Sequence, residues 1–254
     1  MNIVVAVKLV PDLVEELAID ENGTALDPTW LRLILNEPDD HAVEQAVLLK
    51  ESGGGQVTVV ALDAEGIDDV LYTAAAKGVD RLIKLSTTHG AGIGNYALAR
   101  IFANAVKTLR PELILCGVQG HDDLDGAVGS QLAEHLGMPY VGYVAGVTVS
   151  GDRATVRKEY PGGLIAETVV MLPAVLGIQA AAKPPRYVPI ARVRQTMRSA
   201  KIEEQPASEP ESVGGPVVSR MSKAEATERA EMIEGDVDEV ATRLTEILGQ
   251  LGVL

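Results

Sequence analysis

The chain has 254 residues and a formal net charge of −14, with 46% hydrophobic residues, only 3% aromatic residues and one cysteine. This length allows one large domain or one domain with an appendage, and a core of Val, Leu, Ile and Ala suits a buried parallel sheet under alanine-rich helices. The composition argues against a nucleic-acid surface, an internal disulfide, a membrane span and a signal peptide, so we expect a cytoplasmic protein without direct membrane insertion.

Apolar runs alternate with helix-length amphipathic stretches through the first half of the chain. Their periods predict strands at residues 2–7, 57–62, 80–85 and 112–116. Helices are predicted between them, at residues 38–52, 66–77, 93–109 and 126–136. Repeated β–α alternation with short connections predicts a doubly wound, mostly parallel α/β sheet. Ligands of such sheets bind beyond the carboxyl ends of strands, and the candidate ends here follow Val7, Leu62 and Cys116.

The pattern changes after Pro139. Residues 144–149 and 153–159 flank a turn and predict a hairpin. A second turn at residues 160–163 leads into the apolar, strand-like segment 164–178. We expect these segments to add antiparallel strands at the edge of the first sheet.

The C-terminal part is polar and acidic. Residues 203–216 have the composition of a linker. Residues 222–234 and 236–251 predict two helices, with Ser222 and Asp236 as N-caps. Because this amphipathic arm has no sheet of its own, we expect it to pack against another surface.

The loop at residues 117–129 combines features of an anion site with a surplus of anions. Its glycines permit close approach of a ligand to the backbone, and the amides of the helix that follows could meet a phosphate. Yet the loop contains Asp122, Asp123 and Asp125 and no lysine. The glycines could equally be structural, and Asp125 could cap the helix with no ligand present.

No catalytic constellation is apparent in the sequence. Cys116 ends the predicted strand at residues 112–116 and has no apparent histidine partner in sequence, so we interpret it as a small buried residue. His121 with the aspartates after it could ligate a metal, but neighbouring positions rarely converge on one ion, and we predict no metal site. The segment 183–201 has six Lys or Arg and no acid, which fits either a solvated arm or a loop that docks a partner.

Several stretches together resemble the β subunit of electron-transfer flavoprotein. They are "VAVKLVPD" (5–12), "NEPDDHAVEQAVLLKE" (36–51), "TAAAKGVDR" (73–81), "LILCGVQGHDD" (113–123), "YPGGLIAETVVMLPAVLGI" (160–178) and "PPRYVPI" (184–190). The resemblance spans nearly the whole chain. It implies a flavodoxin-like domain over residues 1–185, and a partner-docking segment with a helical C-terminal arm over residues 186–254.

The resemblance also implies an electron-carrier subunit that makes no covalent change itself. A larger α subunit would carry the redox FAD, and this chain would carry AMP in the housekeeping type or a second FAD in the electron-bifurcating type. Flavin dehydrogenases would deliver electrons, and a quinone reductase or ferredoxin-type acceptor would take them. The alternative is a stand-alone adenine-nucleotide-binding protein of the stress-protein or ATP-pyrophosphatase kind, which would need no α subunit.

Carried over by position, the resemblance places the nucleotide at three strand ends and one helix start. The implied contacts are Ala6, Asn36, Glu37, Pro38, Asp39, Leu62, Gly117, Val118, Gln119, Gly120, His121, Asp122, Asp123, Leu124, Asp125, Gly126, Ala127 and Val128. The implied partner-docking residues are Ala182, Lys183, Pro185, Arg186 and Tyr187.

The chain departs from the family pattern at two places. Asp125 stands where the family has an uncharged residue, and Ala127 replaces a glutamine. A second charge about 4 Å from a phosphate repels it by roughly 4 kcal/mol at an effective dielectric of about 20. Asp125 therefore weakens nucleotide binding if it points into the site, leaves less room for phosphate if it caps the helix, and is an ordinary turn residue if it points to solvent. Ala182 stands where housekeeping members have the leucine that anchors acyl-CoA dehydrogenases.

Overall fold

The computed structural model describes residues 1–87, 93–123, 125–208, 214–224, 230 and 232–253. The chain forms two compact units, Met1–Ser219 and Arg220–Leu254. The first unit therefore continues past Pro185, and the docking role expected for residues 186–254 stays a prediction.

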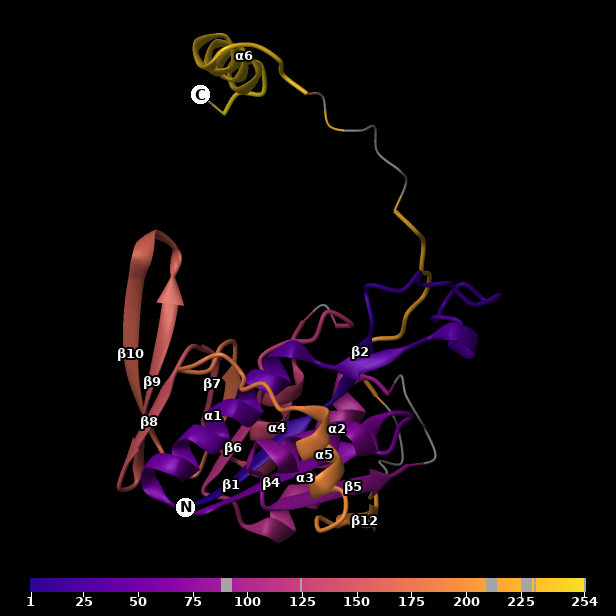
Figure 1. The fold of residues 1–254 in the computed structure, drawn as a ribbon, viewed down its shortest axis with the longest axis vertical. Coiled ribbons are helices and arrows are strands. Elements are labelled where there is room, and N and C mark those ends of the chain that lie inside the picture. The colour runs from indigo at the N-terminus through magenta and orange to yellow at the C-terminus, as the bar shows by residue number, and fades with distance from the viewer. Residues whose placement is uncertain (88–92, 124, 209–213, 225–229, 231, 254) are drawn as a thin grey trace. The chain divides into compact units, whose positions relative to one another are not determined.

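Seven strands of the described residues form one parallel sheet in the larger unit (Figure 1), which confirms the doubly wound, flavodoxin-like class. All neighbouring pairs in it are parallel. Its order is β12 (Ile202–Pro206), β5 (Arg81–Ser86), β4 (Gln56–Leu62), β1 (Asn2–Val7), β6 (Leu113–Gly117), β11 (Ala174–Ile178) and β7 (Tyr140–Val144).

Helices cover both faces of this sheet. The helices α1 (Glu37–Gly53) and α2 (Ile67–Lys77) pack with one set of strand side chains. The helices α3 (Asn95–Leu109) and α4 (Val128–Leu136) pack with the opposite set. Alternation along a strand sends Val5 to the first core and Val4 to the second. Each large side chain fully buried in this way contributes about 1.5–3 kcal/mol.

The antiparallel strands are present, but they form a sheet of their own and not an edge of the parallel sheet. The strands β8 (Val147–Ser150), β9 (Arg153–Tyr160) and β10 (Leu164–Met171) pair antiparallel, with the short helix η2 (Pro161–Gly163) between the last two. Figure 1 shows this ribbon standing beside the parallel sheet. The apolar segment 164–178 thus divides, because β11 is wholly buried between β6 and β7 while β10 is largely exposed.

Residues 202–206 form an edge strand, so the linker prediction is wrong at its beginning. The strand β12 contains two glutamates and a proline. Cationic side chains of β5 pair with both glutamates. Arg81 donates to Glu203 through two nitrogens, at 2.9 and 2.7 Å, and Lys84 Nζ lies 3.2 Å from Glu204. The helix α5 (Ile190–Thr196) precedes this strand and contacts α2.

Shorter elements complete the first unit. The strands β2 (Leu9–Pro11) and β3 (Leu33–Leu35) pair antiparallel, and a single-turn helix, η1 (Pro28–Trp30), lies in the connection between them. Trp30 in that connection is 87% exposed.

The second unit confirms one of the two predicted C-terminal helices. α6 (Val237–Gln250) begins with a capping box in which Asp236 accepts from the amides of Asp238 and Glu239. The described residues of 222–234 are not helical, and residues 225–229 and 231 lie outside the described part. No helix among the described residues is both long and apolar enough to cross a membrane.

Candidate functional site

The order of the strands fixes where a ligand site is expected. From β1 the chain passes to β4 and β5 on one side, and then returns to β6 on the other side of β1. Connections leave opposite faces of the sheet at this reversal, which opens a crevice beyond the carboxyl ends of β1 and β6. A pocket lies there, between the end of β1, the start of α1 and the loop from β6 to α4.

The pocket brings together more than half of the residues that the resemblance implied. Of the implied contacts, Ala6, Asn36, Asp39, Gly117, Val118, Gln119, Gly120, Asp123, Gly126 and Val128 line it. The other described ones, Glu37, Pro38, Leu62, His121, Asp122, Asp125 and Ala127, do not line it. Leu124 lies outside the described residues.

Lys8 lines the pocket but is not among the contacts that the resemblance implied. It directly follows β1, and its Nζ lies 2.6 Å from Asp122 Oδ1 and 2.8 Å from Asp123 Oδ2. Burial alone would lower the pKa of Lys8, but the two carboxylates outweigh it and hold that pKa above its ordinary value. The acidic loop therefore has its lysine, supplied from another strand. A signal existed, because Val7 had already marked this strand end as a ligand position.

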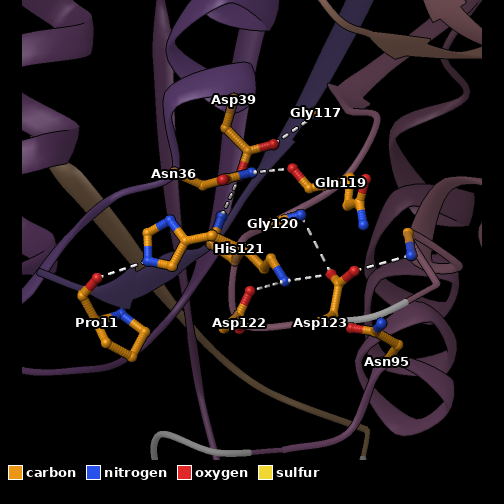
Figure 2. Close-up of polar contacts among 12 residues, drawn as sticks. Pro11, Asn36, Asp39, Asn95, Gly117, Gln119, Gly120, His121, Asp122 and Asp123 are labelled. Atoms are coloured by element: carbon orange, nitrogen blue, oxygen red, sulfur yellow. Dashed lines mark hydrogen bonds and ion pairs between the residues drawn. The ribbon is translucent and has the colours of Figure 1, made fainter. Parts of the chain in front are cut away.

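The loop aspartates accept hydrogen bonds from the loop itself (Figure 2). The carboxylate of Asp123 accepts from the amides of Gly126, at 2.8 Å, and Gly120, at 3.3 Å. Burial raises the pKa of Asp123, yet Lys8 and these amides together bring it below its ordinary value.

Asp125 is held next to the start of α4. Its Oδ1 accepts from the amide of Ala127, at 3.2 Å, and from the side chain of Asn95 on α3, at 3.0 Å. Ala127 is the N-cap residue of α4, and no side-chain hydrogen bond from the described residues caps the first turn of this helix. Asp125 therefore holds the turn before α4 and does not cap the helix, which begins two residues later than predicted.

Asp39 ties the start of α1 to two strand ends. It is buried, and it accepts from the amide of Lys8 at 2.9 Å and from the amide of Gly117. Gly117 has to be glycine here, since a Cβ would lie 2.6 Å from the Asp39 carboxylate. Burial raises the pKa of Asp39 to about 6, against the opposing effect of its hydrogen bonds.

The buried Asp39 predicts a specific pH dependence of stability. Because the pKa of Asp39 is about 6 in the folded state and about 3.8, its ordinary value, in the unfolded chain, the folded state binds more protons between these two pH values. The contribution of Asp39 to stability therefore falls as pH rises through this window, by about 3 kcal/mol at most. Urea unfolding at several pH values should show this slope in the wild type relative to Asp39→Asn, and parallel curves would contradict it.

Asn36 leaves one acceptor unpaired at the pocket. Its side chain is 2% exposed, and Nδ2 donates to the carbonyl of Gln119 at 3.2 Å. Its Oδ1 has no hydrogen-bond partner within the described part of the chain. An unsatisfied buried acceptor costs about 1–3 kcal/mol, so this position favours a ligand or solvent donor.

Cys116 lies in the interior, and His121 lies in a contact that holds the loop in place. Cys116 is buried, as predicted, and burial raises the pKa of its thiol. His121 Nε2 lies 2.6 Å from the carbonyl of Pro11 and so connects the loop to β2 (Figure 2). Among the described residues, no group of three or more His, Cys, Asp or Glu side chains could hold a metal ion.

The implied docking segment lies along α1. The amide of Ala182 donates to Gln45 Oε1 at 3.0 Å. Arg186 points inward, where its guanidinium bonds Glu44 and Glu51. Tyr187 is 85% exposed, and Lys183 is exposed as well, so these side chains are available to a partner.

The fold and the pocket define a doubly wound α/β protein with a polar pocket at the reversal point of its sheet. Residues 31–210 match the family model described as "Electron transfer flavoprotein domain". The chain is 31% identical to the electron transfer flavoprotein subunit beta of Methylophilus methylotrophus, over 98% of both chains. It is 29% identical to the corresponding subunit of Thermoanaerobacterium thermosaccharolyticum, over 100% of both.

A third relative is the acryloyl-CoA reductase electron transfer subunit gamma of Anaerotignum propionicum, which is 33% identical over 74% of this chain and 71% of that protein. The chain therefore belongs to the electron-transfer flavoprotein family, on its β-subunit side, and the resemblance drawn from the sequence is confirmed.

Proposed function

We propose that this chain is the β-type subunit of a heterodimeric electron-transfer flavoprotein whose α-type subunit carries the redox FAD. The match to β subunits over the full length carries the proposal. The three-stranded sheet supports it, because β10 exposes Leu164, Ile165 and Val169 to solvent by 58–68%. Ile165 and Val169 lie on one face of β10 because side chains alternate along a strand, and exposed apolar side chains that share a face are typical of protein-interaction surfaces.

The same proposal extends to the electron donor and acceptor. A flavin dehydrogenase would deliver electrons and a quinone reductase or ferredoxin-type acceptor would take them. The exposed Tyr187 and the exposed arginines of α5, Arg192 and Arg194, support docking of an acidic partner surface in this region.

An AMP or a second FAD in this chain remains the family expectation, and its fit can be tested on the pocket. Lys8 and the unpaired Asn36 Oδ1 favour such a ligand. Against it, Asp123 and Asp125 already accept hydrogen bonds from loop amides that a phosphate would use. The residues as folded therefore do not fit a nucleotide phosphate.

Co-expression with an α-type subunit tests the proposed function. The two chains should co-purify as a yellow complex with a reducible flavin, and the β chain alone should be colourless because the redox FAD belongs to its partner. Absorbance spectra before and after reduction measure this. A β chain that stays a monomer and binds adenine nucleotides without a partner would favour the stand-alone alternative, and a reducible flavin on the isolated β chain would favour the bifurcating type.

A further inference from the structure

In the loop between β6 and α4, aspartate carboxylates of the loop accept the hydrogen bonds that a bound phosphate would otherwise accept. Five donors contact its carboxylates, two from elsewhere in the chain and three from the loop itself. They are Lys8 Nζ, Asn95 Nδ2 and the amides of Gly120, Gly126 and Ala127. Each of them donates to a carboxylate of Asp122, Asp123 or Asp125.

The carboxylates of Asp123 and Asp125 occupy loop amides that precede α4. Asp123 accepts from the amide of Gly126, and Asp125 accepts from the amide of Ala127, while no side-chain hydrogen bond from the described part of the chain caps the first turn of the helix. Asp123 also meets the lysine at 2.8 Å. A single residue thus contacts a cation and loop amides, the two kinds of partner that a phosphate uses.

The charge balance of the loop leaves no attraction for a further anion. Among the described residues that line the pocket, Lys8 is the one lysine or arginine, and Asp123 is the one lining carboxylate of the loop. Asp122 and Asp125 do not line the pocket, but they add two further negative charges to the loop, and Asp122 also pairs with Lys8. The buried Asp39 lies on the other side of the pocket. A phosphate would have to displace carboxylates that are already hydrogen-bonded.

We propose that Asp122, Asp123 and Asp125 take the place of a nucleotide phosphate in this subunit, so that its heterodimer forms with no AMP or second FAD bound to this chain. The inference rests on the proposed β-subunit function and departs from the nucleotide content that the family implies. Lys8 is then a positioning residue, which holds the loop closed against the end of β1.

The first test is the nucleotide content of the purified heterodimer. Mass spectrometry of the nucleotides released on denaturation should find FAD in proportion to the α-type subunit and AMP far below the amount of protein. AMP equal to the protein, or twice the expected FAD, would overturn the proposal. If no complex with an α-type subunit forms, the proposed function fails instead, which is a separate result.

The second test restores the phosphate site by removing charge. In calorimetric titrations of the heterodimer, wild type should bind AMP no more tightly than adenosine. Asp123→Asn with Asp125→Asn should tighten AMP binding by about tenfold or more and leave adenosine binding unchanged. Asp125→Thr with Ala127→Gln should act in the same direction and keeps the Asp123 contacts with Lys8 and Gly126.

A matched control separates the local effect from the loss of net charge. Asp152→Asn with Glu21→Gln removes two exposed charges elsewhere in the chain and should leave both affinities unchanged. Circular dichroism verifies that each variant is folded. Wild-type binding of AMP well above that of adenosine, or equal AMP affinity in wild type and both folded loop variants, would refute the substitution of phosphate by aspartate.

Discussion

Removing residues 217–254 is expected to abolish the complex with the α-type subunit while leaving the parallel sheet folded. The region contains α6, whose apolar side chains Val240, Leu244, Ile247 and Leu248 fall on one face at helical spacing. None of the described residues of α6 is buried. A helix of 14 residues is only marginally stable alone in water, so its apolar face needs a partner surface.

The truncated chain should bind the partner at least about a hundredfold more weakly, which corresponds to about 2.7 kcal/mol. Analytical ultracentrifugation of mixed subunits measures this, and circular dichroism verifies the fold of the shortened chain. A point variant sharpens the test: Leu244→Asp should weaken the complex strongly, whereas Thr242→Asp on the opposite face should not. A truncated chain that still forms the complex at full strength would show that α6 is not the docking element.

The core of the fold could be predicted because its signals are local. The strands β1, β4, β5 and β6 are short apolar runs, and the helices between them show amphipathic spacing. The separate sheet of β8, β9 and β10 could be predicted as strands, but not as a separate sheet. Which strands pair depends on the burial of β11 and the exposure of β10, and that contrast is not visible in two neighbouring apolar runs.

Two other features escaped prediction because their partners are distant in sequence. The strand β12 is polar, and its stability comes from Arg81 and Lys84, more than a hundred residues earlier. Lys8 lies 114 residues from Asp122. The strand end after Val7 is a candidate ligand position in the sequence, but neither local stretch identifies the other as its partner. Only the reversal of strand order, which places the ends of β1 and β6 side by side, makes this pairing possible.

Replacing Arg186 by methionine is expected to destabilise the chain by about 3–5 kcal/mol, because it leaves the buried carboxylate of Glu44 without an ion-pair partner. The side chain of Glu44 on α1 is 3% exposed, and Arg186 meets it at 2.9 Å. The backbone amide of Arg186 also donates to Glu44, at 3.0 Å, and the guanidinium continues to Glu51 at 2.6 Å. The ion pair therefore fastens the segment after β11 to the surface of α1.

Removing the unpaired carboxylate of Glu44 as well should recover most of the lost stability. Arg186→Met combined with Glu44→Gln should be clearly more stable than Arg186→Met alone, since the double variant buries no unpaired charge. Arg157→Met is the matched control, because Arg157 pairs with Glu159 at 2.8 Å with both side chains about half exposed, and such pairs contribute about 0–1 kcal/mol. Urea unfolding midpoints of the four chains decide the matter. If Arg186→Met is no more destabilising than Arg157→Met, the guanidinium is not a structural clamp, and its expected role in docking a partner gains weight.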